Sequence, residues 1–197
     1  MNLPNVLTLV RMPLTFAIVA LMYGTWRWAA TIAFWLFIAA ALSDWLDGKF
    51  ARDRNIVSDF GKFMDALCDK VLVLGILIAV LDRDYLRLPG VFVVLLVLVV
   101  VTREFMISGL RMMAAARGVV MAAEWGGKIK TIIQLTALGF LLAEPMLARD
   151  LAPVSRWPLD GLITTVHWVG LGLFFVSMGF MLSSMWTYYR KYRHVLF

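Results

Sequence analysis

The chain is 197 residues long, 62% hydrophobic and only 16% charged, with a net charge of +6. A soluble domain is roughly 45–50% apolar and about 25% charged, so this composition indicates a polytopic membrane protein. The basic residues flank apolar segments and form no stripe interleaved with aromatic residues, which argues against a nucleic-acid partner. Cys68 is the single cysteine, which excludes an internal disulfide.

About six apolar segments are long enough to cross a bilayer, whose core of ~30 Å needs roughly 20 helical residues. They lie near residues 5–23, 29–48, 59–81, 90–112, 125–144 and 162–186. All are predicted to be helices, because a backbone in lipid must satisfy its own hydrogen bonds. Polar links join them without any low-complexity tract, so we expect one all-α transmembrane catalytic domain over residues 1–197.

Lysines and arginines are unevenly divided between the two sides of these spans. One side carries Lys49, Arg52, Arg54, Arg111, Arg117, Lys128, Lys130, Arg190, Lys191 and Arg193, and the other carries Arg27, Arg83, Arg87, Arg149 and Arg156. The richer side of a multi-pass protein is normally cytoplasmic. With six spans, we expect both termini and the richer side to face the cytoplasm, in the inner (cytoplasmic) membrane.

Four aspartates flank the link between the second and third spans. Asp44 and Asp47 are three residues apart, and Asp65 and Asp69 are four apart, so each pair shares a helical face. The short link predicts antiparallel neighbours whose four carboxylates converge at one depth. Such charges repel unless a cation neutralises them, and oxygen ligands favour Mg2+, Mn2+ or Ca2+ over zinc. The alternative is ordinary loop acids paired with Lys49, Arg52, Lys62 and Lys70.

Small residues accompany these carboxylates: Gly48 and Ala51 after the first pair, and Gly61 one turn before Asp65. A glycine inside a helix costs about 1 kcal/mol relative to alanine, so these glycines indicate room for a ligand. Close helix packing is the alternative.

The combined motif is Asp44-x2-Asp47-Gly48-x2-Ala51-Arg52-x8-Gly61-x3-Asp65-x3-Asp69. It resembles the complete signature of the CDP-alcohol phosphatidyltransferase family, and the six-span pattern resembles the membrane domain of that family. The resemblance implies transfer of a phosphatidyl group from a CDP-linked lipid to an alcohol, with release of CMP and help from two Mg2+ or Mn2+ ions. It also implies a homodimer.

The resemblance further implies residue roles. Asp44, Asp47 and Asp65 would ligate metal, and Asp69 would both ligate metal and deprotonate the acceptor hydroxyl. The CDP-lipid would lie against Gly48, Ala51, Arg52 and Gly61, with a hydroxyl contact from Ser58 in the same link.

The first span carries a polar stripe. Asn5, Thr8 and Arg11 step by three and therefore project along one side of a helix. The segment resembles the Pro-Asn-x2-Thr-x2-Arg element of the family, which borders the nucleotide. The alternative is that Asn5 and Thr8 cap the helix while Arg11 reaches to lipid phosphates.

A second polar cluster bears on the acceptor. Arg103, Arg111, Lys128 and Lys130 predict a cationic pocket, which suits an acceptor that carries a phosphate. These stretches resemble the Thr-Arg-Glu…Ser-x-Leu-Arg and Gly-Lys-x-Lys-Thr elements of bacterial phosphatidylglycerolphosphate synthases, which implies CDP-diacylglycerol and glycerol 3-phosphate as substrates. Lys128 and Lys130 lie about 200° apart on an ideal helix, so one of them would face elsewhere. A topology signal is the alternative for each basic residue.

Other functions are compatible with parts of this pattern. Within the family, the acceptor could be that of a CDP-alcohol-type cardiolipin synthase, or of an inositol-phosphate or serine transferase. A divalent-cation or proton-coupled transporter would also carry intramembrane carboxylates, but here they gather at one face and no inverted repeat is visible. An intramembrane aspartyl protease would leave two aspartates and Arg52 unexplained.

Overall fold

The computed structural model describes the backbone of residues 3–54, 59–117 and 125–196. Side chains are described within these ranges except for residues 3–9, 44–54, 59–63, 65, 66, 69, 116, 125, 126, 128 and 192–196. The elements are α1 (Leu3–Tyr23), α2 (Ala29–Arg54), α3 (Asp59–Asp82), α4 (Gly90–Ala116), α5 (Trp125–Pro145), a π-helical turn η1 (Met146–Leu151) and α6 (Asp160–Leu196). Every regular element in the described ranges is helical, so the all-α prediction is confirmed.

The helices begin close to the predicted positions, but three of them end four or more residues later. α2 continues to Arg54 beyond the expected end at residue 48, α4 to Ala116 beyond residue 112, and α6 to Leu196 beyond residue 186. The apolar pattern marks where lipid contact ends, whereas a helix continues until a breaker stops it. Ala51 and Arg52 favour helix, and no proline follows Gly48 in α2, so the helix extends through the polar segment.

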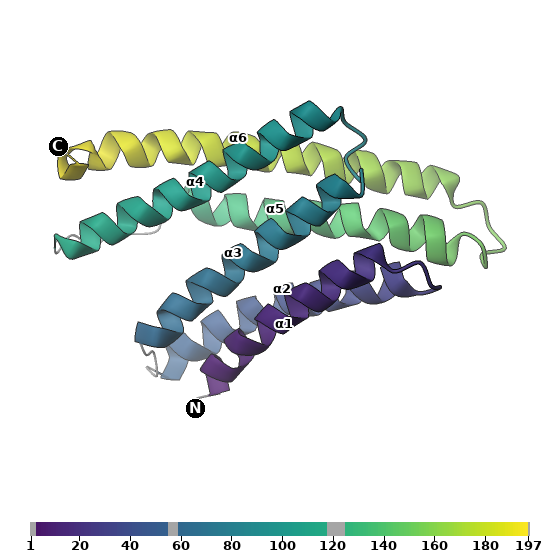
Figure 1. Ribbon diagram of the computed structural model, residues 1–197, viewed down its shortest axis with the longest axis horizontal. Helices are drawn as coiled ribbons and strands as arrows, with labels where there is room; N and C mark the ends of the chain where they lie inside the picture. Colours follow the sequence, from purple (N-terminus) through teal and green to yellow (C-terminus); the bar gives the residue numbers. More distant parts are fainter. Residues whose placement is uncertain (1–2, 55–58, 118–124, 197) are drawn as a thin grey trace.

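Successive helices run in opposite directions along the molecule (Figure 1). The first residues of α1, α3 and α5 and the last residues of α2, α4 and α6 therefore lie at one end, which we call the aspartate end. The opposite end holds the connections around residues 24–28, 83–89 and 146–159. α1 packs against both α2 and α3, α5 packs along α6 and against α2, and α4 contacts α3 and α6.

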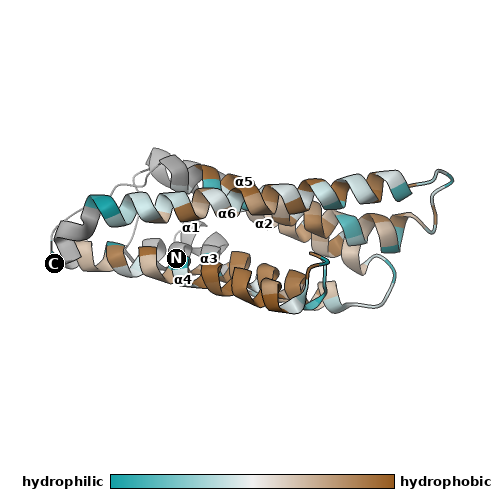
Figure 2. Cartoon of the chain, turned by 90° about the horizontal axis from the view of Figure 1, so that it is seen from above, coloured by the Kyte–Doolittle hydropathy of each residue, from teal (hydrophilic) through white to brown (hydrophobic). Residues whose placement is uncertain are grey.

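Hydrophobic residues cover the middle of the helices, as expected for a protein in lipid (Figure 2). In the described part of the chain, three helical segments are long and apolar enough to cross a membrane: Gly90–Ala115, Ile129–Leu151 and Asp160–Lys191. Two shorter apolar segments are Val10–Tyr23 and Ala29–Ser43. Exposed tryptophans at the opposite end fit an interfacial belt, namely Trp26, Trp28, Trp157 and Trp168.

α5 and α6 pack closely at Gly170. A Cβ added there would lie 3.0 Å from Phe140 Cβ and 3.2 Å from the Leu141 backbone nitrogen. The same atom at Gly161, Gly172 or Gly179 would meet nothing within 4 Å. Only one of the four glycines in α6 is therefore required by close helix packing. This contact fixes α6 against α5, and thereby positions the polar side chains that both helices carry nearer the aspartate end.

Candidate functional site

The predicted metal ligands lie near the end of α2 and near the start of α3. Asp44 and Asp47 belong to the last turns of α2, and Asp65 and Asp69 to the first turns of α3, at the aspartate end. Because both segments are helical, each pair shares one helical face, and an all-carboxylate donor set fits hard divalent cations. Their side chains lie outside the described residues.

Several predicted CDP-lipid contacts also fall on residues whose side chains are not described. Asn5 and Thr8 lie in the first turns of α1, and Gly61 lies in the first turn of α3. Ser58 belongs to the segment 55–58, outside the described residues. The remaining positions lie in the last turns of α2: Gly48, Ala51 and Arg52.

Arg11 is described, and it points inward. It is only 2% exposed on α1, the helix that contacts both aspartate-bearing helices. Its carbonyl oxygen accepts a hydrogen bond of 2.9 Å from the hydroxyl of Thr15. A side chain reaching for lipid phosphates would be exposed, so its burial disagrees with the lipid-contact alternative.

Arg103 and Lys130 meet on one carboxylate. Arg103 Nη1 donates to Glu104 Oε1 at 2.9 Å, and Lys130 Nζ donates to the same oxygen. The side chains of Arg103 and Lys130 are each 7% exposed, and that of Glu104 is 15% exposed. α4 and α5 thus place two buried cations and one anion together.

Ser184 joins this group from α6. Arg103 Nη2 donates to Ser184 Oγ at 2.9 Å, and Ser184 Oγ donates to the Met181 carbonyl at 3.0 Å. We call Arg103, Glu104, Lys130 and Ser184 the Glu104 cluster. Its formal charge is positive by one unit, because two cations share one carboxylate.

Two buried polar atoms in or next to the Glu104 cluster have no hydrogen-bond partner among the described residues. One is the Nε of Arg103, a donor, and the other is the Oε1 of Gln134, an acceptor. Gln134 follows Lys130 by one turn of α5 and is 2% exposed. Buried polar groups in native proteins are almost always bonded, so such atoms indicate a ligand or ordered water. A phosphorylated alcohol offers both an acceptor oxygen and a donor hydroxyl.

Arg111 lies apart from the Glu104 cluster. Its Nη2 donates to the hydroxyl of Tyr188 at 3.1 Å, and its guanidinium lies 5.7 Å from the centre of that ring. Eight residues of helix separate Arg111 from Arg103, about 12 Å along the axis. Arg103 and Lys130 thus share Glu104, while Arg111 lies further along α4, nearer the aspartate end. The side chain of Lys128 is not described.

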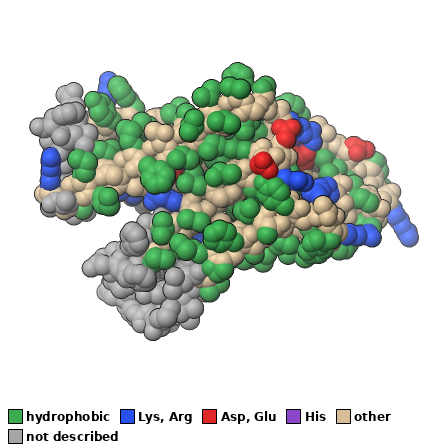
Figure 3. Space-filling model, in the orientation of Figure 1, with side chains coloured by type: hydrophobic (Ala, Val, Ile, Leu, Met, Phe, Trp, Pro, Cys, Tyr) green, Lys and Arg blue, Asp and Glu red, His purple; other side chains and the backbone are tan. Residues whose placement is uncertain are grey.

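Basic side chains also gather on the surface at the aspartate end. Figure 3 shows lysine and arginine atoms on the described surface there, below α4 and α6. Clustered positive charge attracts anionic ligands.

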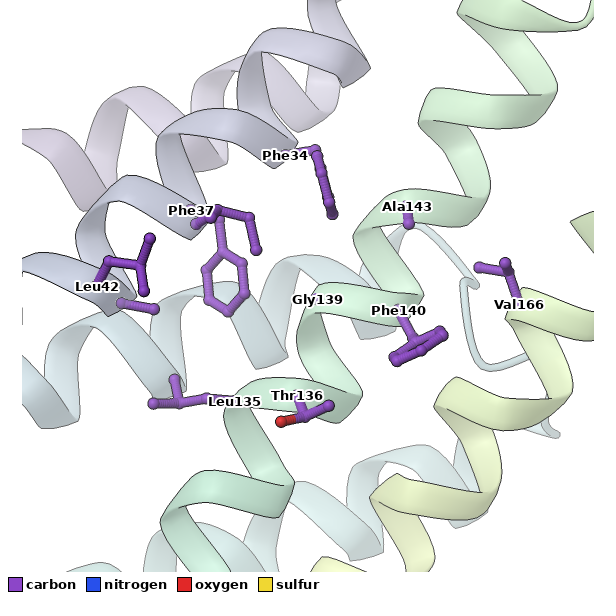
Figure 4. A pocket seen from close by; sticks show the side chains of 11 residues that line it. Phe34, Phe37, Leu42, Leu135, Thr136, Gly139, Phe140, Ala143 and Val166 are labelled. Atoms are coloured by element: carbon purple, nitrogen blue, oxygen red, sulfur yellow. The ribbon is translucent and has the colours of Figure 1, made fainter. Parts of the chain in front are cut away.

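A largely apolar cavity of about 350 Å3 lies between α2, α5 and α6. Figure 4 shows Phe34 and Phe37 from α2 and Phe140 from α5 around it. The one hydroxyl in its lining, on Thr136, donates to the Ile132 carbonyl of its own helix. The cavity therefore suits hydrocarbon and is no site for a phosphate or nucleotide.

The opposite end has its own buried carboxylate, Glu144 on α5. His167 Nδ1 from α6 lies 2.9 Å from Glu144 Oε2, and Arg87 pairs with Glu144 Oε1. His167 is 3% exposed, but the side chain of Arg87 is 59% exposed. This group, the Glu144 cluster, joins the start of α6 to the connection before α4.

Comparison with known proteins decides the family. The model of the CDP-alcohol phosphatidyltransferase family matches residues 1–185. The chain belongs to this family. The resemblance inferred from the aspartate motif is confirmed, and the chain is a transferase of phospholipid biosynthesis.

Curated relatives carry two different names. The chain is 34% identical over 202 residues to a CDP-diacylglycerol–glycerol-3-phosphate 3-phosphatidyltransferase of Bacillus subtilis, covering 96% of this chain and 94% of the relative. A Salmonella typhimurium protein of the same name is 34% identical over 189 residues, covering 95% and 92%. A cardiolipin synthase (CMP-forming) of rice, Oryza sativa subsp. japonica, is 32% identical over 204 residues, covering 100% of this chain and 59% of the relative.

Sequence reasoning missed Ser184 and Tyr188 in this phosphatidyltransferase. They are four residues apart on α6 and hold Arg103 and Arg111 of α4, respectively. The available signal was a polar side chain repeated after one turn within an apolar span. Their arginine partners depend on how α4 crosses α6, which the local pattern does not specify.

Proposed function

We propose that this phosphatidyltransferase transfers the phosphatidyl group of CDP-diacylglycerol to sn-glycerol 3-phosphate, giving phosphatidylglycerol phosphate and CMP. The observation that carries the proposal is the Glu104 cluster, in which two buried cations share a single carboxylate. Excess buried positive charge is unfavourable without an anion, and a phosphate supplies it with charge-assisted hydrogen bonds. Free inositol or serine would not bring that phosphate. The names of the bacterial relatives agree with this acceptor.

The aspartates complete the proposed site. Asp44, Asp47, Asp65 and Asp69 would hold two Mg2+ or Mn2+ ions, whose charge offsets that of the pyrophosphate and of the departing CMP. Enzymes of this family generally depend on divalent metals. The CDP-lipid would lie against α1 and the link between α2 and α3, contacting Asn5, Thr8, Arg11, Gly48, Ala51, Arg52, Ser58 and Gly61.

The proposed reaction is a single in-line displacement. The acceptor hydroxyl oxygen forms a bond to the phosphorus that bears the diacylglycerol, and the bond from that phosphorus to the CMP oxygen breaks. The electron pair leaves with CMP, and Asp69 takes the hydroxyl proton. Arg103, Arg111, Lys128 and Lys130 would bind the phosphate of the acceptor.

Cardiolipin synthesis is the second candidate, because the rice relative carries that name. Its acceptor would be phosphatidylglycerol, which carries a phosphodiester in place of a phosphomonoester. A buried, positively charged cluster favours the more highly charged phosphomonoester. The two acceptors are therefore the most informative pair in an activity assay.

Sidedness is part of the proposal: the active site and both termini would face the cytoplasm from the inner membrane. Cys68, the only cysteine, is 1% exposed, so a cysteine introduced at an exposed position would be labelled selectively. Arg117→Cys at the aspartate end should resist a membrane-impermeant maleimide in spheroplasts, while Arg156→Cys should react. Reaction of Arg117→Cys alone would reverse the proposed orientation.

A homodimer is also proposed. α4 offers a surface for a second copy, because it leaves apolar side chains such as Val91, Phe92, Phe105 and Met112 exposed. Cysteine crosslinking across this face would give a covalent dimer. A monodisperse monomer in mild detergent, with no crosslinking in membranes, would contradict it.

The function is tested by following CMP release from CDP-diacylglycerol by purified protein with Mg2+ or Mn2+. Glycerol 3-phosphate, phosphatidylglycerol, inositol phosphate and serine are offered separately. We expect rapid release only with glycerol 3-phosphate. Release with phosphatidylglycerol alone would assign the cardiolipin activity instead.

A further inference from the structure

We infer that Glu104 is a positioning residue, whose carboxylate holds Arg103 and Lys130 in the arrangement that binds the phosphate of the acceptor. The inference rests on the proposed function and concerns a residue with no role in it so far. Glu104 is the only one of the three side chains with a negative charge, so its part in anion binding is indirect.

The geometry shows why two cations need this carboxylate. Both Arg103 Nη1 and Lys130 Nζ donate to the same oxygen, Glu104 Oε1, so the two positive groups lie close together. They come from different helices and are almost fully buried. Without an anion between them they would repel one another in a medium of low dielectric constant. Glu104 therefore allows both to occupy one site before the acceptor arrives.

Ser184 orients the arginine from the other side. Arg103 Nη1 binds Glu104 and Nη2 binds Ser184, which fixes the plane of the guanidinium. The Nε of Arg103 is the donor left without a partner among the described residues. A phosphate oxygen placed against Nε would complete the hydrogen bonds of this arginine. Lys130, held on the same carboxylate oxygen, adds its positive charge to the same site.

The charge balance agrees with this role. The Glu104 cluster carries one net positive charge, and a phosphomonoester brings up to two negative charges. Glu104 thus lowers the repulsion between the cations without cancelling their attraction for phosphate. A site that is ordered in advance binds its ligand with a smaller loss of side-chain entropy. The ligand whose binding depends on Glu104 is therefore the acceptor, and the CDP-lipid is not affected.

The test compares Glu104→Gln with the matched control Glu144→Gln in the full chain. Glutamine keeps the size of the side chain and removes its charge. The two variants are matched because Glu104 and Glu144 are both buried carboxylates that pair with two basic groups. CMP release is measured with glycerol 3-phosphate varied at saturating CDP-diacylglycerol, and then with the lipid varied. We expect Glu104→Gln to raise KM for glycerol 3-phosphate about tenfold or more, with KM for the lipid within twofold of the wild type. Glu144→Gln should leave both KM values within twofold.

Coupling to Lys130 separates positioning from a general structural defect. If Glu104 acts through Arg103 and Lys130, the double variant Glu104→Gln/Lys130→Met should lose less kcat/KM for glycerol 3-phosphate than the product of the two single losses. Multiplicative losses would contradict positioning. Glu104→Asp, which keeps the charge and shortens the reach, should fall between wild type and Glu104→Gln. It also provides the readout if Glu104→Gln does not accumulate.

The outcomes distinguish this inference from the proposed function. If the wild type releases no CMP with glycerol 3-phosphate, both are overturned. If the wild type is active and Glu104→Gln leaves KM for glycerol 3-phosphate unchanged, or raises both KM values equally, only the inference is overturned.

Discussion

Glu104 and Glu144 are both buried carboxylates that pair with two basic side chains, at opposite ends of the molecule. The Glu104 cluster buries both of its cations, whereas the Glu144 cluster combines a buried histidine with an arginine whose side chain is 59% exposed. Solvent can therefore reach the charge at the opposite end. The cations of the Glu104 cluster are shielded from solvent and depend on anionic partners such as Glu104. Similar pairing thus includes a solvent-accessible cation at one end and two buried cations at the other.

The largest expected contrast is between aspartates at the two ends. Asp69→Asn should lower kcat by about 10²–10⁴-fold, as expected for loss of a general base, and leave CDP-lipid binding largely intact. Asp150→Asn is the matched control, because Asp150 is buried and accepts hydrogen bonds of 2.7 and 2.8 Å from the backbone nitrogen and hydroxyl of Thr31. It should lower thermal stability and leave kcat nearly unchanged.

Lipid binding is the readout that decides the role of Asp69. Equilibrium binding of CDP-diacylglycerol to both variants would be measured alongside CMP release. A loss of lipid binding as large as the loss of turnover in Asp69→Asn would remove the support for a base.

The second contrast concerns the cations. Lys130→Met should raise KM for glycerol 3-phosphate roughly 30-fold or more, since it removes one of the two buried cations of the Glu104 cluster. Arg87→Met should change KM less than twofold, because its side chain is largely exposed and lies at the opposite end. Similar KM values in the two variants would mean that burial of the cation has no bearing on acceptor binding.

The third contrast tests the packing that holds α6 in place. Alanine at Gly170 would meet the Leu141 backbone nitrogen at 3.2 Å, whereas alanine at Gly172 would meet nothing within 4 Å. Gly170→Ala should therefore be less stable than Gly172→Ala by about 1–3 kcal/mol, the usual effect of overpacking. Denaturant unfolding in mixed micelles measures the difference. Equal stability of the two variants would show that α5 and α6 can move apart at position 170 without loss of stability.

The smallest expected effect is that of Tyr188→Phe. This variant keeps the ring beneath Arg111 and removes the hydroxyl that accepts its 3.1 Å hydrogen bond. A buried hydrogen bond to a charged donor stabilises a structure by about 1.5–3 kcal/mol. This bond contributes less, because Arg111 is exposed. We expect KM for glycerol 3-phosphate to rise a few-fold. An unchanged KM would exclude Arg111 from the acceptor site.

Much of the fold could be predicted from hydropathy, because lipid imposes helices of a minimum length. The family could be predicted from the spacing of Asp44, Asp47, Asp65 and Asp69, whose chemistry is local to two adjoining helices. The nucleotide contact of Arg11 is compatible with its burial and stays a prediction.

What could not be predicted depends on contacts between distant helices. The pairing of Arg103 with Ser184 requires the crossing of α4 over α6, and Lys130 meets Glu104 because α5 approaches α4 there. Gly170, Gly172 and Gly179 lie in one apolar span, and the local pattern does not reveal that of these three only Gly170 faces a neighbouring backbone. The hydrogen bond from Arg111 to Tyr188 likewise depends on how α4 and α6 cross.

The most direct test of the account is CMP release by the purified wild-type protein, with glycerol 3-phosphate and phosphatidylglycerol offered in turn at the same CDP-diacylglycerol and Mg2+ concentrations. The account predicts release with glycerol 3-phosphate that stops when the metal is chelated, and little release with phosphatidylglycerol. Release that is equal with and without glycerol 3-phosphate, or that persists in a chelator, would contradict it.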